Sequence, residues 1–269
     1  MTRIQSEGAE FQLLEALLRN RRKREQRREF LIEGVRAITR ALDAGWPVRA
    51  ALVPDVAERS RWATETLDRV DDVTVVRPDL FARLTERTEP PELVLVGRIP
   101  PPDLAAVPWP SDGVVVVVDR PASPGNLGAI IRTSDALGAA AVLTTGHGAH
   151  LYDPQTVRAS VGSLFVLPVV PVESNQVLVD WLASWRAQAE VTVYATDEDG
   201  DVVLGADPAL RRPALLLLGS ERTGLSAALR DLADVTVAIP MAGSASSLNV
   251  AVAHGIVLHA LLSTVTPHG

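Results

Sequence analysis

Six short, uninterrupted apolar runs in the second half of the chain constrain its fold more than any other feature. They alternate with segments of helical spacing, and unbroken apolar runs are typical of strands covered on both faces, as in a parallel sheet. The sequence therefore predicts an α/β domain in which crossover helices connect parallel strands. The expected strands are Val114–Val118, Ala140–Leu143, Phe165–Val170, Val191–Ala195, Ala214–Leu218 and Val235–Ile239. The expected helices are Asn126–Leu137, Gln155–Ser163, Asn175–Ala189, Ser226–Leu232 and Leu248–Leu262.

The first hundred residues predict a smaller α/β unit, because strand-like and helix-like segments alternate there too. The proline-rich stretch Ile99–Gly113 can support neither a central strand nor a helix interior. We therefore expect a domain over 1–98, a linker over 99–112 and a second domain over 113–269. In the first domain we expect helices over Glu10–Leu18, Phe30–Ala44, Glu58–Arg69 and Pro78–Glu86, and strands over Arg49–Val53, Val73–Val76 and Leu93–Val96.

The net charge of −7 argues at first against a nucleic-acid partner, but the charges are unevenly distributed. Residues 1–100 hold 18 of the 26 basic and 17 of the 33 acidic side chains. A basic cluster over residues 19–28 predicts contact with RNA phosphates. Its candidate contacts are Arg19, Arg21, Arg22, Arg24 and Arg28. The alternative is a solvated helix face whose arginines pair with Glu15, Glu25 and Glu29.

Residue types that are absent or scattered exclude several classes of site. The chain has no cysteine, which excludes disulfides, zinc–thiolate sites and cysteine nucleophiles. Its five histidines lack metal-ligand spacing, so no metal is expected. The N-terminus does not follow the signal-peptide pattern, and polar residues interrupt the apolar stretch Leu248–Val265. We expect a cytoplasmic protein.

Ligands of open parallel sheets bind at the carboxyl ends of the strands, so the segments that follow the strands carry the candidate chemistry. After Val118, Asn126 stands between two glycines where a helix should begin, and Arg132 follows almost two turns later. Free backbone N–H groups and a guanidinium at a helix start favour a phosphate, the alternative being a plain asparagine cap. This strand is not followed by G-x-G-x-x-G and the chain has no G-K-S/T, which excludes the ordinary dinucleotide and P-loop sites.

Two further segments follow later strands. After Leu218, Gly219 allows a close backbone approach to a ligand and Glu221 places a carboxylate at the strand end. After Ile239, a loop of small residues leads to Ser247 and Asn249 at the start of the last helix. Capping of a helix is the alternative for both Glu221 and Ser247.

Together the segments NLGAIIRT, LLLGSERTGLS and IPMAGSASSLNVAVA resemble, in this order, the three motifs of the SpoU/TrmH family. Members of this family, within the SPOUT superfamily, are S-adenosylmethionine-dependent RNA ribose 2′-O-methyltransferases with a deep trefoil knot. The resemblance covers residues 113–265, and the segment REFLIEGVR at 28–36 resembles the start of an L30e-like RNA-recognition domain. It implies a homodimer through the C-terminal domain and a target in 23S ribosomal RNA. Some members of this two-domain design confer resistance to ribosome-targeting antibiotics, so a resistance function is a further expectation.

The resemblance also implies a role for each motif residue. The catalytic set would be Asn126, Arg132, Glu221, Ser247 and Asn249, with Glu221 anchoring Arg132 and Arg132 also contacting RNA. The cofactor, S-adenosylmethionine, would be held by Leu218, Gly219, Ile239, Met241, Leu248 and Asn249. No metal is implied.

Three other functions compete with this one. A ribose methyltransferase acting on transfer RNA would use the same chemistry, and a non-catalytic ribosomal RNA-binding protein would use the L30e-like half alone. A nucleotide-dependent oxidoreductase is the remaining option at the level of fold. Base-carbon methyltransferases with a cysteine nucleophile are excluded by the composition.

Overall fold

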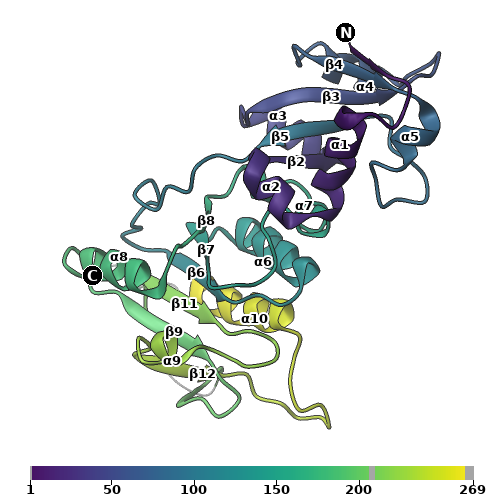
Figure 1. The fold of residues 1–269 in the computed structure, drawn as a ribbon. Coiled ribbons are helices and arrows are strands. Elements are labelled where there is room, and N and C mark those ends of the chain that lie inside the picture. Colours follow the sequence, from purple (N-terminus) through teal and green to yellow (C-terminus); the bar gives the residue numbers. More distant parts are fainter. Residues whose placement is uncertain (1, 206–209, 264–269) are drawn as a thin grey trace. The chain divides into compact units, whose positions relative to one another are not determined.

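The computed structural model describes residues 2–205 and 210–263 and divides the chain into two compact units. The first comprises Met1–Pro101 together with His150–Val166, and the second comprises Pro102–Ala149 with Leu167–Gly269. The last six positions of the domain expected at 113–269 lie outside the described residues. Each unit is built around its own sheet (Figure 1).

The first unit has a five-stranded sheet in the order β1-β4-β3-β5-β2, in which β5 runs antiparallel to both neighbours. Its strands are β1 (Thr2–Ile4), β2 (Glu29–Glu33), β3 (Val48–Pro54), β4 (Val73–Val76) and β5 (Val94–Arg98). Its helices are α1 (Ala9–Arg19), α2 (Arg21–Arg27), α3 (Val35–Asp43), α4 (Arg61–Leu67), α5 (Pro78–Ala82) and α7 (Pro154–Ser160), with a 3-10 turn η1 (Ser163–Phe165).

The helix expected over Phe30–Ala44 is wrong in its first part. Residues 29–33 form β2, whose five side chains are all buried and whose backbone pairs with β5. Gly34, with φ of +97°, then turns the chain into α3. Burial between neighbouring elements overrides the helical spacing of the apolar residues here.

Residues 150–166 pack with the first unit, whereas the sequence placed them in the second domain. Their aromatic side chains explain this. Tyr152 lies 4.7 Å from Phe30 between ring centroids, and Phe165 lies 5.1 Å from Trp46. These ring contacts join residues 150–166 to the core of the first unit.

The second unit has a fully parallel seven-stranded sheet in the order β10-β12-β9-β11-β6-β7-β8, which confirms the expected sheet. Its strands are β6 (Val114–Asp119), β7 (Ala141–Thr145), β8 (Val169–Pro171), β9 (Thr192–Thr196), β10 (Val202–Val203), β11 (Ala214–Leu218) and β12 (Val235–Ala238). Its helices are α6 (Pro124–Leu137), α8 (Asn175–Arg186), α9 (Ala227–Arg230) and α10 (Val250–Ser263). The strand expected over Phe165–Val170 begins only at Val169, because η1 occupies residues 163–165.

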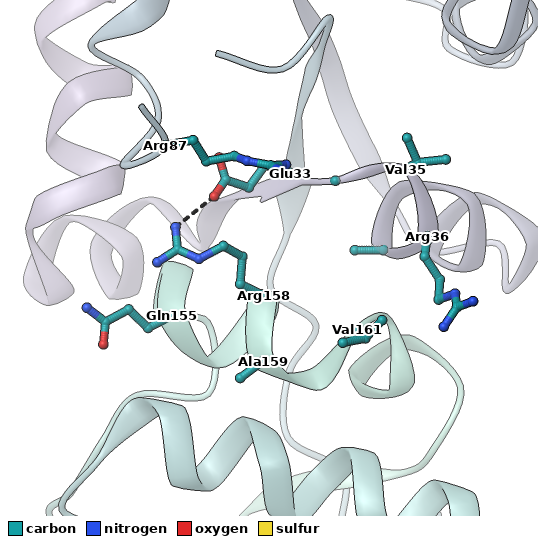
Figure 2. A pocket seen from close by; sticks show the side chains of 10 residues that line it. Glu33, Val35, Arg36, Arg87, Gln155, Arg158, Ala159 and Val161 are labelled. Carbon is teal, nitrogen blue, oxygen red and sulfur yellow. Dashed lines mark hydrogen bonds and ion pairs between the residues drawn. The ribbon is translucent and has the colours of Figure 1, made fainter. Parts of the chain in front are cut away.

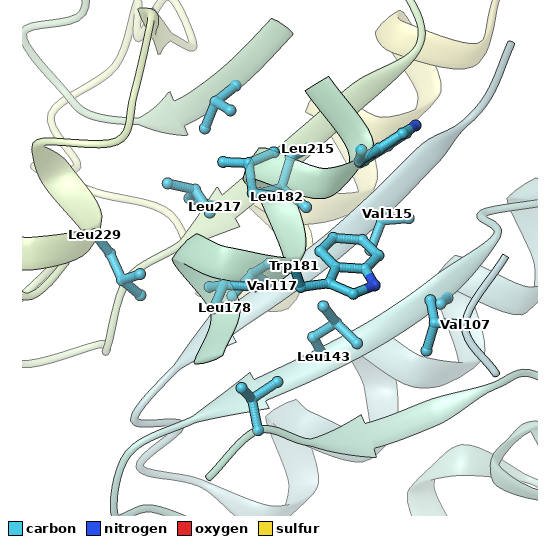
Figure 3. Close-up of a cluster of buried hydrophobic side chains, with 14 of the residues drawn as sticks. Val107, Val115, Val117, Leu143, Leu178, Trp181, Leu182, Leu215, Leu217 and Leu229 are labelled. Carbon is cyan, nitrogen blue, oxygen red and sulfur yellow. The ribbon is translucent and has the colours of Figure 1, made fainter. Parts of the chain in front are cut away.

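One face of this sheet is covered by α8. Its Trp181 and Leu182 pack among Val115, Val117 and Leu215, as Figure 3 shows. Successive strand residues point to opposite faces, so Val116 and Leu216 point to the other face. That face carries α10, which contacts β6, β11 and α6.

The α6–α10 packing contains a buried polar pair. Ser134 Oγ lies 3.1 Å from His254 Nε2, and both residues are fully buried. Burial lowers the pKa of His254 to about 4, so its imidazole is neutral at pH 7. The pair fixes the register of the two helices that carry the first and third motifs.

None of the helices in the described part of the chain combines the length and apolar character that crossing a bilayer requires.

Candidate active site

The strand order reverses at β6, which has β7 and β8 on one side and β11 and β9 on the other. Such a switch point opens a crevice at the carboxyl ends of the neighbouring strands. The segment after β6 and the segment after β11 carry the first and second motifs, so both meet at this edge. The parallel pairing of Val118 with Leu218 sets the two strand ends side by side.

Three motif residues form one hydrogen-bonded group, the amide–carboxylate network. Asn126 Nδ2 donates to Glu221 Oε1 at 2.8 Å, and Asn249 Nδ2 donates to Asn126 Oδ1 at 3.1 Å. The other Glu221 oxygen, Oε2, accepts from the Ala122 backbone N–H at 2.9 Å. The Asn126 amide is therefore held at both ends, and its orientation is fixed.

Helix capping was the alternative role for Asn126 and for Ser247, and the first turns of α6 and α10 show which residues cap these helices. Ser123, not Asn126, caps α6: its hydroxyl accepts from the Asn126 backbone N–H at 3.3 Å. Asn249 accepts from the Ala251 N–H at 2.9 Å, so Asn249 rather than Ser247 satisfies the first turn of α10. Sequence reasoning missed Ser123, although serine before proline is an ordinary helix start.

Glu221 remains ionised in this setting. Partial burial raises the pKa of its carboxyl, but the hydrogen bonds from Asn126 and from the backbone outweigh burial and lower the pKa below its ordinary value. The expected anchoring of Arg132 by Glu221 is wrong, because both carboxylate oxygens bind groups of the first motif.

Arg132 and Ser247 stay outside the network. Arg132 is exposed on α6, and its side chain makes no hydrogen bond or ion pair with the described residues. Ser247 is likewise exposed on the loop before α10. An exposed arginine that has no partner among the described residues is available to a phosphate.

Two residues that the sequence did not single out, Asp119 and Arg120, form further hydrogen bonds at the carboxyl end of β6. Asp119, the last residue of β6, is buried and accepts from the Ser226 N–H at 2.7 Å and from Thr145 Oγ1 at 3.1 Å. Arg120 donates to Asp119, to the Gly224 carbonyl at 2.9 Å and to Thr223 Oγ1 at 3.2 Å. Their position directly at the end of a predicted strand is the sequence feature that could have identified them.

Gly219 is needed for a tight loop. A Cβ on it would lie 2.5 Å from Gly224 C and 2.5 Å from Leu225 N, so only glycine fits. Residues 219–225, the 219–225 loop, close on themselves through a bridge between Ser220 and Gly224. The neighbour that requires glycine at this position is the loop's own backbone.

The loop over residues 239–249 exposes two large apolar side chains. Met241 is 41% and Leu248 is 36% exposed although both are large and apolar. These side chains follow β12 near the carboxyl edge of the sheet and have the character that covers a flat base. Ile239 is half-buried, and Leu218 is buried inside β11, so Leu218 can offer a ligand only its backbone.

The described residues contain no group of three or more His, Asp or Glu side chains placed to hold a metal ion.

The basic cluster of the first unit divides into buried and exposed members. Arg24 is 3% exposed; its Nη1 donates to the Leu17 and Leu18 carbonyls and its Nη2 donates to Asp153. The RNA-contacting role expected for Arg24 is therefore wrong, because its buried guanidinium binds the last carbonyls of helix α1 and neutralises the half-buried carboxylate of Asp153.

The exposed members of the cluster remain candidates. Arg22 is without a partner in the described chain, and Arg28 donates only to the Ile99 carbonyl. Arg21 pairs with Glu25 at 2.7 Å, and Arg19 lies 3.8 Å from Glu15. The expected pairing with Glu29 is wrong, since Glu29 pairs with Arg49.

A groove of about 650 Å³ in the first unit is lined by further arginine side chains (Figure 2). Arg158 within it is bound to Glu33 and Glu86, each at 2.8 Å. Arg36 and Arg87 also line the groove, and their guanidinium groups have no partner among the described residues. The groove contains none of the motif residues and presents free positive charge next to the exposed Val35.

Comparisons with known proteins agree with this geometry. A model of the SpoU rRNA Methylase family matches residues 113–259, and a model of the SpoU L30e-like domain matches residues 8–95. A 23S rRNA (uridine(2479)-2′-O)-methyltransferase from Streptomyces viridochromogenes is 48% identical over 96% of this chain and 90% of its own. The 23S rRNA (guanosine(2553)-2′-O)-methyltransferase RlmP of Bacillus subtilis (strain 168) is 31% identical over 91% of this chain and 92% of its own.

A solved structure is similar over nearly the whole chain. The SpoU methyltransferase AviRb from Streptomyces viridochromogenes, in complex with the cofactor AdoMet, matches with a TM-score of 0.89 and 46% identity. The match covers 95% of this chain and 97% of that chain.

Proposed function

The chain belongs to the SpoU rRNA Methylase family, and on that premise we propose that it transfers a methyl group from S-adenosylmethionine to a ribose 2′-hydroxyl of 23S ribosomal RNA. The observation that carries the proposal is the amide–carboxylate network at the strand switch point, with an exposed arginine on the same helix α6 that has no partner among the described residues. Two relatives bear names that specify 2′-O transfer to 23S rRNA. The absence of cysteine excludes covalent attack on a base carbon.

The cofactor would lie between the 219–225 loop and the 239–249 loop. Exposed Met241 and Leu248 would cover its adenosine, together with Ile239. Backbone groups of Leu218 and Gly219 would contact it at the end of β11. When bound, the sulfonium supplies an electrophilic methyl group.

The remaining chemistry belongs to the chain's own residues. As the 2′-oxygen forms its bond to the methyl carbon, the carbon–sulfur bond breaks to leave a neutral thioether, and the hydroxyl proton would pass to solvent water. Arg132 would hold an adjacent phosphate and stabilise negative charge that develops on the oxygen. A guanidinium remains protonated at neutral pH, which suits it to this task. Asn126 and Asn249, oriented by Glu221, would position the hydroxyl, and a preorganised donor of this kind contributes about 3 kcal/mol.

The first unit would bind the RNA. Arg22 and Arg28 of the basic cluster and Arg36 and Arg87 of the groove offer exposed guanidinium groups for phosphates. The proposal also includes a homodimer through α10, a trefoil knot in the second unit and action on ribosomes in the cytoplasm. A resistance function against ribosome-targeting antibiotics is included because the target is ribosomal.

The test uses labelled S-adenosylmethionine, unmodified 23S rRNA and digestion with alkali. Alkaline cleavage requires a free 2′-hydroxyl, so the label is expected in a dinucleotide that resists hydrolysis. A substrate with a 2′-deoxy nucleotide at the mapped position is expected to accept no label. Label on an ordinary mononucleotide, or on the 2′-deoxy substrate, would mean that a base is the acceptor.

A parallel reaction with transfer RNA distinguishes the main alternative. Labelling of transfer RNA alone would leave the chemistry in place and refute the substrate. A protein that binds 23S rRNA but not S-adenosylmethionine would be a non-catalytic RNA-binding protein. Mapping the labelled position also decides whether the target corresponds to that of either relative.

A further inference from the structure

Arg120 has an unusual backbone conformation. Its φ of +49° lies in the left-handed region, where side chains other than glycine are rarely found. Such a conformation persists only where surrounding contacts hold it, and it is found preferentially at functional sites. Arg120 directly follows β6, at the strand switch point described above.

The guanidinium of Arg120 connects two segments more than one hundred positions apart. On one side, Nε lies 3.2 Å and Nη2 lies 3.0 Å from Asp119 Oδ2. On the other side, Nη2 donates to the Gly224 carbonyl at 2.9 Å and Nη1 donates to Thr223 Oγ1 at 3.2 Å. The arginine therefore links the end of β6 to the 219–225 loop.

Asp119 strengthens this link between β6 and the 219–225 loop through hydrogen bonds of its own. Its carboxylate is 1% exposed and also holds the Ser226 N–H and the Thr145 hydroxyl. Burial raises the pKa of Asp119, but hydrogen bonds from Arg120, Ser226 and Thr145 lower it overall, so the group is an anion that requires a cation. The pair thus fixes β6, β7 and the loop after β11 to one another.

Glu221 lies within the loop that is held in this way, and its carboxylate orients the Asn126 amide. We propose that Arg120 is a positioning residue for methyl transfer: with Asp119 it fixes the 219–225 loop so that Glu221 holds Asn126 in its working orientation. The inference rests on the proposed function. Arg120 reaches Asp119, Gly224 and Thr223 through separate nitrogens of a rigid planar group, whereas a lysine has a single ammonium nitrogen to place among them.

The test compares Arg120→Lys, Glu221→Gln and the double variant. Lysine keeps a positive charge beside buried Asp119, so the fold is expected to persist. We expect kcat of Arg120→Lys to fall at least tenfold while the Kd for 23S rRNA stays within twofold. Because Arg120 acts through Glu221, the double variant should be no slower than the slower single variant. Arg186→Lys, which alters a surface pair with Asp234, is the control and should stay within twofold.

A kcat of Arg120→Lys within twofold of the wild type, or a double-variant loss equal to the product of the single losses, would overturn the proposal. Hydrogen exchange separates this result from a failure of the proposed function. The amides of Ser226 and Gly224 should exchange at least tenfold faster in Arg120→Lys than in the control. Unchanged exchange rates refute the positioning role whatever the activity, and a wild type without methyl transfer refutes the function alone. If Arg120→Lys does not fold, unprotected exchange of Ser226 in the wild type refutes the role.

Discussion

Asn249 has two separable tasks at the level of single residues. Its side-chain oxygen accepts from the Ala251 N–H at the start of α10, and its side-chain nitrogen donates to Asn126. Asn249→Asp keeps the acceptor and loses the donor, whereas Asn249→Ala loses both. The two variants therefore distinguish helix capping from catalysis.

We expect Asn249→Asp to lower kcat by about 10- to 100-fold, because the Asn126 amide is no longer held. Its free energy of unfolding should stay within about 0.5 kcal/mol of the wild type, while Asn249→Ala should lose about 1 kcal/mol. Turnover assays and urea unfolding measure the two effects. An Asp variant with wild-type kcat would exclude Asn249 from the network's function.

Arg132 and Gly219 are predicted to fail in different ways. Arg132→Ala should lose about 100-fold in turnover with unchanged cofactor affinity, because we propose that its exposed guanidinium binds an RNA phosphate rather than the cofactor. Gly219→Val should lose cofactor affinity, because its side chain would displace Gly224 and Leu225 and open the loop. Calorimetry with S-adenosylmethionine beside a turnover assay decides. Equal loss of cofactor binding in both variants would refute the separation of roles.

At the level of elements, the arginines of α2 have two roles. Buried Arg24 stabilises the fold, whereas the exposed arginines are expected to bind RNA. Arg24→Ala should lower the free energy of unfolding by about 2 kcal/mol, because two carbonyls of α1 and Asp153 lose their partner. Arg22→Ala should leave stability unchanged and reduce the slope of log Kd against log salt for RNA by about one. Urea unfolding and RNA titration over a range of salt concentrations test both. An unchanged salt slope after replacement of Arg22, Arg28, Arg36 and Arg87 together would show that these arginines do not bind phosphates.

Helix α10 presents an apolar stripe that the described chain leaves uncovered. Val252 is 51% and Ile256 is 40% exposed, and a spacing of four places them on one face. We expect this face to bury itself in a homodimer. Sedimentation should give about twice 28.8 kDa at micromolar concentration, and Ile256→Asp should give the single-chain mass. A 28.8 kDa species for the unaltered protein would refute the dimer.

At the level of the whole molecule, stability should fall on mild acidification. Burial lowers the pKa of both His150 and His254 to about 4, helped at His150 by Arg24 and Arg21. The unfolded chain takes up protons near pH 6.5 and the folded protein does not, so the unfolded state is favoured as pH falls from 6.5 to 4. Each histidine contributes about 3 kcal/mol over that range. Urea unfolding at pH 7 and pH 5 measures the loss, and His254→Gln should reduce it by about half. An equal pH dependence in that variant would exclude His254 as a source.

The strands of the second unit and the sites of its chemistry were predictable from the sequence, because both are local properties. Unbroken apolar runs such as Val114–Val118 and Ala214–Leu218 require cover on both faces, and parallel strands bring their ends to one edge. Asn126, Glu221 and Asn249 could therefore be named from their positions after strands. The strand β2 could not, because its burial depends on β5, and even the pair with the smallest separation, Glu33 and Val94, is 61 positions apart in the chain.

Which partners those residues choose was decided by the tertiary structure alone. Glu221 and Asn126 are separated by 95 positions, and only the insertion of β11 beside β6 brings the carboxylate to the amide rather than to Arg132. The same holds for Arg24, which lies 129 positions from Asp153 yet is buried against it. Residue type and spacing determine which groups can do chemistry, whereas the order of strands in the sheet determines the distances between them.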